Sequence, residues 1–122
     1  MICYTLTDGR GNSEKLRLIS NENNVLKFEG NDSILNIRSG KNGVVKLYRD
    51  NSEVRVSIEL NVGSVTKMKI YDKSHNLYVD CQVKAKRVDI GDTGDIFIEY
   101  DMLNGEEIAD SISVKIGVEN DN

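Results

Sequence analysis

Apolar and polar residues alternate along almost every segment of this chain that could form regular structure. The clearest example is residues 53–60, Glu-Val-Arg-Val-Ser-Ile-Glu-Leu, in which every second residue is apolar. Successive side chains of a β-strand point to opposite faces of a sheet, so a two-residue period indicates a strand with one buried face. Similar segments recur at intervals of roughly ten residues, which is typical of an all-β protein. The predicted fold class is therefore all-β.

Short polar connections separate the predicted strands. They are rich in Gly, Asn and Asp, which favour turns because they tolerate left-handed backbone angles or hydrogen-bond to their own backbone. Asn42-Gly43, within residues 39–43, is the dipeptide most typical of a β-hairpin. The alternation predicts about ten strands, at residues 2–6, 15–19, 25–28, 34–38, 44–49, 53–60, 66–70, 77–90, 96–100 and 112–118.

The phase of the alternation changes once within the longest of these segments. Apolar residues occupy the odd positions from Leu77 to Ala85, but Val88 and Ile90 occupy even positions. One extra residue in a strand forms a β-bulge, so the change of phase predicts a bulge at Lys86-Arg87. A turn at Lys86 is the alternative.

Strands with one buried face need a second layer that covers this face. The 122 residues suit one domain, spanning residues 1–122, in which roughly two-thirds of the surface of the unfolded chain can be buried. The predicted architecture is a single antiparallel β-sandwich, with a small barrel as the alternative.

Composition narrows the classes of partner and the compartment. The net charge of −4 argues against a nucleic-acid-binding protein, which usually carries a basic domain or stripe. No segment reaches the roughly 20 apolar residues of a membrane span. The N-terminus has no basic leader and no long apolar run, so we expect no signal peptide and a location in the cytoplasm or in a particle such as a virion. Cys3 and Cys81 are then expected to be reduced thiols.

No set of residues in the chain predicts catalysis. The one histidine, His75, follows Ser74 in a predicted loop, where neighbouring residues do not face each other as a catalytic triad requires. Two cysteines and one histidine cannot complete a structural zinc site without carboxylates. Glu59 and Asp80 could serve an enzyme that uses carboxylates, but no motif pairs them. We therefore predict a protein that is not an enzyme and that has no cofactor.

One stretch of acidic residues suggests a cation site. Asp89, Asp92 and Asp95 are three residues apart, with Gly91 and Gly94 between them. An EF-hand loop instead places its first calcium ligands at alternate positions. We interpret the stretch as a glycine turn flanked by solubilising acids, and we keep the three aspartates as a calcium candidate only.

Four aromatic residues lie on the phase opposite to the aliphatic residues of their strands. If this phase faces outward, the rings are exposed, and tyrosine is favoured at protein interfaces because its ring is apolar and its hydroxyl can hydrogen-bond. The alternatives are that both faces of these strands are covered, or that the rings form cross-strand pairs. The predicted interface residues are Tyr48, Tyr71, Tyr78 and Phe97.

Two groups of basic residues accompany them. Acidic residues are interleaved with both groups, and no aromatic cluster adjoins them. A solvated strand edge is therefore a simpler interpretation than a contact with nucleic acid. The groups are Arg38, Lys41, Lys46 and Arg49, and Lys84, Lys86 and Arg87.

The order of several segments resembles that of the N-terminal β-sandwich modules of phage baseplate and tail proteins. The segments are Arg38–Gly43, Tyr71-Asp72, Val79–Val83 and Gly94–Asp101. The first 30 residues do not follow the pattern. The resemblance implies a non-catalytic assembly module that docks through its sandwich faces or strand edges.

The functional prediction is a structural or adaptor protein that acts through contacts with other protein subunits, as a homo- or hetero-oligomer and as part of a larger, phage-like assembly. The alternative is a small carbohydrate- or ligand-binding module. This alternative predicts that Tyr48, Tyr71 and Tyr78 lie together on one exposed face.

Overall fold

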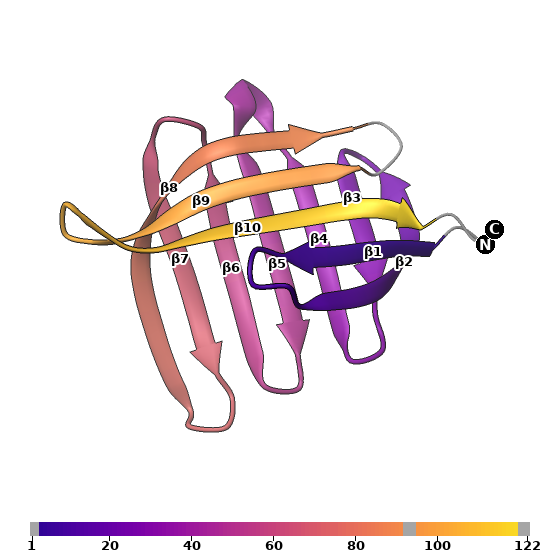
Figure 1. Cartoon of the computed structure of the whole chain (residues 1–122), viewed down its shortest axis with the longest axis horizontal. Helices are drawn as coiled ribbons and strands as arrows, with labels where there is room; N and C mark the ends of the chain where they lie inside the picture. Colours follow the sequence, from indigo (N-terminus) through magenta and orange to yellow (C-terminus); the bar gives the residue numbers. More distant parts are fainter. Residues whose placement is uncertain (1–2, 92–94, 120–122) are drawn as a thin grey trace.

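Ten antiparallel strands make up the part of the chain that the structure describes (Figure 1). The computed structural model describes residues 3–91 and 95–119. A short 3-10 helix, Lys41–Gly43, connects β4 to β5. The strands are β1 (Cys3–Asp8), β2 (Ser13–Glu22), β3 (Val25–Glu29), β4 (Ser33–Ser39), β5 (Val45–Asn51), β6 (Val54–Leu60), β7 (Val65–Asp72), β8 (Leu77–Ile90), β9 (Ile96–Asn104) and β10 (Glu107–Glu119).

Each strand pairs with the next along the chain, and β10 pairs with β1, so that the sheet closes into a barrel. The all-β prediction is confirmed, and the chain adopts the barrel that the sequence analysis gave as the alternative to a sandwich. Closure removes most of the unpaired strand edges that an open sheet would present. Among the described residues, no helix is long and apolar enough to cross a membrane.

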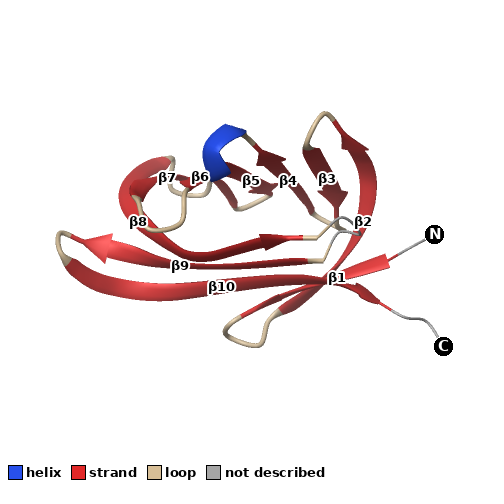
Figure 2. Ribbon diagram, turned by 90° about the horizontal axis from the view of Figure 1, so that it is seen from above, coloured by secondary structure: helices blue, strands red, loops and turns tan. Residues whose placement is uncertain are grey.

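The barrel is flattened into two layers whose strands cross at a steep angle (Figures 1 and 2). Strands that pass from one layer to the other need a bend, which a β-bulge supplies. β8 pairs with β7 through residues 77–84 and with β9 through residues 82–90, and its register shifts between Ala85 and Arg87. The predicted bulge at Lys86-Arg87 is therefore confirmed. β2 passes between the layers in the same way, with a register shift between Leu18 and Ser20.

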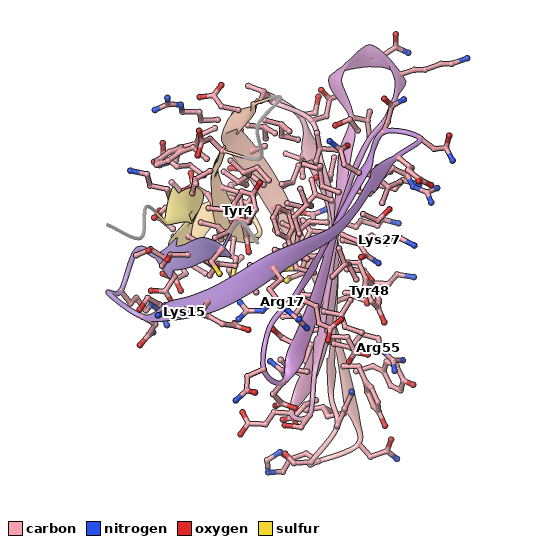
Figure 3. All side chains as sticks on the ribbon, turned by 90° about the vertical axis from the view of Figure 1, so that its right-hand side faces the viewer. Tyr4, Lys15, Arg17, Lys27, Tyr48 and Arg55 are labelled. Carbon is pink, nitrogen blue, oxygen red and sulfur yellow. The ribbon has the colours of Figure 1, made fainter. Side chains whose placement is uncertain are left out.

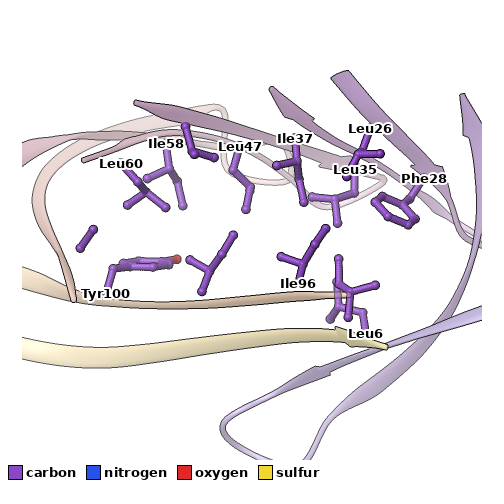
Figure 4. Packing of buried hydrophobic residues seen from close by; sticks show 14 of the residues in the cluster. Leu6, Leu26, Phe28, Leu35, Ile37, Leu47, Ile58, Leu60, Ile96 and Tyr100 are labelled. Atoms are coloured by element: carbon purple, nitrogen blue, oxygen red, sulfur yellow. The ribbon is translucent and has the colours of Figure 1, made fainter. Parts of the chain in front are cut away.

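The interior is filled by apolar side chains from every strand. In Figure 3 Tyr4 points into the barrel, whereas Lys27, Tyr48 and Arg55 project from its outer surface. The ring of Tyr4 meets the fully buried ring of Phe28 edge to face, with 5.4 Å between the centroids. Figure 4 shows side chains of both layers meeting between the sheets. A ten-stranded barrel could enclose a wide lumen, but flattening brings the layers close enough for side chains to fill it.

Polar side chains face inward at one end of the barrel. Glu14 lies opposite the buried Leu6 on the neighbouring strand, and Arg49 lies opposite the buried Leu35, so both belong to the inner face. The carboxylate of Glu14 accepts hydrogen bonds from Ser33 Oγ and from the Arg49 guanidinium, the latter at 2.9 Å. This network satisfies the polar groups where the apolar core ends.

Among the titratable residues of the core, Tyr100 has the pKa that departs most clearly from its ordinary value. Burial raises the pKa of its phenol to about 12, from an ordinary value of 10.0. Between these two pH values the unfolded chain loses the proton while the folded chain retains it, so stability falls as the pH rises.

We predict that Tyr100→Phe removes this alkaline loss. The wild type should lose about 2–3 kcal/mol of unfolding free energy through Tyr100 between pH 10 and pH 12, on top of the losses that both proteins share. Urea denaturation of both proteins at several pH values measures the difference. Parallel curves for wild type and Tyr100→Phe across this range would contradict the assignment.

Candidate interaction surface

The outer face of the layer formed by β3 to β8 carries a continuous row of polar side chains. Cross-strand pairing sets their order: each residue of the row lies directly opposite the next on the neighbouring strand. Alternation along each strand turns these side chains away from the core. The row consists of Lys27, Asn36, Tyr48, Ser57, Lys69 and Asp80.

A shallow depression of about 480 Å³ lies over the middle of this row. Tyr48 and Ser57 line it together with Lys67 and Lys69 of β7. The Tyr48 hydroxyl is 3.5 Å from Asp50 Oδ2, at the limit of a hydrogen bond. The depression therefore offers an aromatic ring, hydroxyls and three lysine ammonium groups, beside the single carboxylate of Glu59. We call this region, with the outward residues around it, the lysine–tyrosine face.

Basic side chains outnumber acidic ones on the lysine–tyrosine face, although the whole chain has a net charge of −4. Arg38 and Lys46 even lie directly opposite each other, an arrangement that costs stability because like charges repel. The outward basic residues are Lys27, Arg38, Lys46, Arg55, Lys67, Lys69 and Lys84, and the outward acidic residues are Glu29, Asp50, Glu59 and Asp80.

Most of these cations are available to a partner. Of the seven, Arg55 is the one with an ion pair within 4.0 Å to a described carboxylate, Asp50, at 3.8 Å. Lys73 also binds Asp50, at 2.6 Å, and this hydrogen bond is the main reason why the pKa of Asp50 lies below its ordinary value. The anion of Asp50 is thus already neutralised within the molecule. Glu59 lies opposite Lys46 and Asp80 lies opposite Lys69, but neither carboxylate forms an ion pair within 4.0 Å with these lysines among the described residues.

Three of the four predicted interface aromatics lie on this face. Tyr71 and Tyr78 are opposite each other on β7 and β8, and their rings stack with centroids 4.4 Å apart. Tyr78 is 74 % exposed, whereas Tyr48 and Tyr71 are partly buried. Phe97 does not join them, because it belongs to β9 in the other layer, where the Arg87 guanidinium lies 4.5 Å from its ring centroid.

The two predicted basic groups are not single clusters. Arg49 is separated from Arg38 and Lys46 because it faces the inside of the barrel. Lys86 reaches across to the buried Asp101, at 3.3 Å, and Arg87 pairs with Asp89. Arg49, Lys86 and Arg87 are therefore engaged in ion pairs within the molecule and are not free to bind a partner.

The loop between β7 and β8 brings Asp72, Ser74 and His75 together without forming a catalytic triad. His75 Nδ1 lies 2.8 Å from Asp72 Oδ2 and 3.1 Å from Ser74 Oγ. A triad needs the serine and the carboxylate on different ring nitrogens. Hydrogen bonds from Ser74 and then His75 lower the pKa of Asp72, so this group stabilises the turn.

No cluster of three or more metal-ligating side chains occurs among the described residues. Of the calcium candidate, Asp92 lies outside the described residues, Asp89 is engaged with Arg87, and Asp95 accepts a hydrogen bond from the Val118 amide at 3.3 Å. Cys3 and Cys81 are free thiols, and burial raises the pKa of Cys81.

Sequence reasoning did not place Lys67 and Lys69 beside Tyr48, where both line the depression. Both occupy the polar phase of the predicted strand at 66–70, so the signal was present in the alternation. What placed them beside Tyr48 is the pairing of β5, β6 and β7, which a single sequence does not state.

Comparison of the chain with protein-family models, with curated proteins and with solved structures found no match. The resemblance to phage baseplate and tail modules therefore stays a prediction.

Asn36, the neighbour of Tyr48 in the row, carries an unsatisfied acceptor. Its Oδ1 atom is buried and has no hydrogen-bond partner among the described residues. We predict that Asn36→Val raises the free energy of unfolding by about 1 kcal/mol, since it removes this acceptor and places a β-branched residue in a strand.

Thermal unfolding followed by circular dichroism checks this prediction. Ser57→Val is the matched control, because it makes a similar change in strand propensity at an exposed position of the same row. If Asn36→Val raised the free energy of unfolding no more than Ser57→Val does, the unsatisfied Asn36 acceptor would not destabilise the protein.

Proposed function

We propose that the protein is a non-enzymatic structural or adaptor subunit whose lysine–tyrosine face binds an acidic segment of a partner protein. The excess of basic side chains around Tyr48, in a chain of net negative charge, is the observation that carries the proposal. Complementary charge steers association and fixes which partner is accepted.

The chemistry of the depression fits a peptide segment better than a compact ligand. Lys67 and Lys69 can each pair with a carboxylate, and Ser57 offers a hydroxyl between Tyr48 and Lys69. Tyr48 presents a ring against which aliphatic or aromatic side chains of the segment can pack. A shallow surface of this kind buries little of a small molecule, whereas an extended chain can follow the row across several strands.

Assembly into a larger particle is consistent with this mode of binding. The ten paired strands hold the lysine–tyrosine face rigid, so that little conformational entropy is lost on docking. The proposal includes a role as a subunit of a larger assembly, as the resemblance to phage modules implies.

The experiment uses a poly-glutamate peptide as a probe, titrated into the ¹⁵N-labelled protein and followed by NMR. We expect shifts at the amides of Tyr48, Ser57 and Lys69, and an affinity that falls as the salt concentration rises. Lys67→Glu/Lys69→Glu should weaken binding by roughly tenfold or more, because two attractions become repulsions.

Lys41→Glu/Lys115→Glu is the matched control, with the same change of net charge at two exposed sites outside the face. If both double variants lost the same affinity for the peptide, the net charge of the protein would explain the loss, and the proposed site would be refuted. A panel of neutral oligosaccharides forms the second arm: shifts at Tyr71 and Tyr78 with a neutral sugar, but none with the peptide, would replace the proposal with carbohydrate binding.

A further inference from the structure

The first half of β8 has a neighbouring strand on one side only. β8 is 14 residues long; residues 77–84 pair with β7, and pairing with β9 begins at Gln82. Within the described part of the chain, residues 77–81 therefore form an open strand edge. In Figure 1 this part of β8 runs along the margin of its layer, down to the β7–β8 turn.

Backbone hydrogen-bonding groups of this edge are directed outward. The Ala85 carbonyl accepts a hydrogen bond from the Gly63 amide at 3.2 Å, so the backbone groups of Ala85 point toward the β7 side. Successive residues of an antiparallel strand point their N–H and C=O groups to alternate sides. Counting back from Ala85, Tyr78 and Asp80 direct their backbone groups to the open side.

The first three side chains of this edge are apolar and exposed on both faces, and Asp80 is the charged residue that follows them. Leu77 is 54 %, Tyr78 is 74 % and Val79 is 42 % exposed. Natural sheets usually protect an open edge with a bulge, a proline or a charged residue that points inward. The register of β8 with β7 is regular over residues 77–84, and none of these devices occurs between Leu77 and Val79.

An open edge on β10 is protected. β1 covers β10 only from Val114 onward, and the uncovered part of β10 has a register shift between Ile108 and Asp110. There the Ser111 amide donates to Asp110 Oδ1 at 2.9 Å, and Arg10 holds the Asp110 carboxylate. The one-sided stretches of β2 and of β8 beyond Ala85 adjoin register shifts as well, whereas residues 77–79 of β8 have none and are free to pair.

We propose that the β8 edge pairs with the β8 edge of a second copy of this chain, antiparallel, about a two-fold axis at Val79. In this register Val79 lies opposite the second copy's Val79, as a non-hydrogen-bonded pair. Tyr78 lies opposite the second copy's Asp80, and both of these symmetric pairs exchange two backbone hydrogen bonds. On the inner face, Leu77 lies opposite the second copy's Cys81.

Charge and backbone geometry select this register. Asp80 already lies opposite Lys69 on β7, and the dimer adds the second copy's Tyr78 hydroxyl on its other side, so no like charges oppose each other. An axis at Tyr78 instead would place Asp80 opposite the second copy's Asn76. Asn76 has a φ of +49°, a left-handed turn conformation that cannot continue a strand.

The dimer does not rest on the proposed function, since it uses the edge of β8 and not the lysines of β7. Sedimentation equilibrium over a roughly hundredfold range of concentration tests it, because mass action makes a dimer concentration-dependent. We expect the mass to rise from 13.7 kDa toward twice this value.

Val79→Lys should keep the mass at that of the monomer, because it would place two ammonium groups opposite each other at the axis. Ile34→Lys is the matched control: Ile34 is 46 % exposed and lies between Glu29 and Asp50, so a lysine there should leave the dimer intact. Thermal unfolding of both variants verifies that they fold. A wild-type protein that is monomeric at every concentration, or a dimer that survives Val79→Lys, would overturn the proposal.

A crosslinking experiment tests the register itself. Residues of a non-hydrogen-bonded pair have Cα atoms about 4.5 Å apart, within the range that a disulfide spans. Val79→Cys in a Cys3→Ser/Cys81→Ser background should therefore form a covalent dimer under mild oxidation. Ile34→Cys in the same background should not, and equal crosslinking of the two would refute the two-fold axis at Val79.

The same variants separate the two proposals. Val79→Lys retains Lys67 and Lys69, so it should bind poly-glutamate as the wild type does while losing the dimer. Lys67→Glu/Lys69→Glu should lose peptide binding. If it also abolished the dimer while Val79→Lys did not, the lysine–tyrosine face would be the self-association surface and the β8 edge proposal would be wrong.

Discussion

Two bent strands hold this fold closed, and the other features depend on them. β2 and β8 each pair with one layer at one end and with the other layer at the other end. A regular strand cannot serve two crossed layers, so each has a register shift at the point where it turns. Without these shifts the sheet would stay open, and the apolar inner face of both layers would be exposed to water.

Closure explains why the open edges lie where they do. A strand that divides its length between two partners has a stretch at each end with one neighbour only. In β8 this stretch carries Leu77 and Val79, which occupy the inward phase yet remain about half exposed because the opposite layer does not reach them. The open edge is therefore a geometric consequence of the fold. β10 protects its open stretch with a register shift and polar contacts of Asp110, whereas β8 exposes apolar side chains there.

Local sequence predicted the parts of the fold that depend on neighbouring residues. The two-residue period found ten strands, and the change of phase after Ala85 located the bulge of β8. The pairing of β1 with β10 could not be found in this way, since it joins residues about a whole chain length apart and leaves no periodic signal. For this reason the barrel was the alternative prediction and not the first.

For the candidate surface, too, the sequence predicted what depends on neighbouring residues and not what depends on strand pairing. Alternation alone placed Tyr48, Tyr71 and Tyr78 on the outward phase, and the structure brings them to one layer. It could not place Phe97 in the other layer, because phase gives the face of a strand and not the layer to which the strand belongs. Arg49 was predicted to belong to a solvated basic group because it is charged. In the structure it faces inward, opposite Leu35, and the Glu14 carboxylate satisfies its charge.

The two proposed surfaces draw on different physical forces, although they share one layer. Binding at the lysine–tyrosine face depends on charges at an exposed surface, which salt screens over roughly 8 Å at physiological ionic strength. Pairing at the β8 edge depends on backbone hydrogen bonds and on burial of Leu77, Tyr78 and Val79, which salt weakens little. Because both surfaces belong to the same rigid layer, a dimer would place two lysine–tyrosine faces on one continuous sheet. A partner with two acidic segments could then bind both at once, with an effective local concentration that a monomer cannot offer.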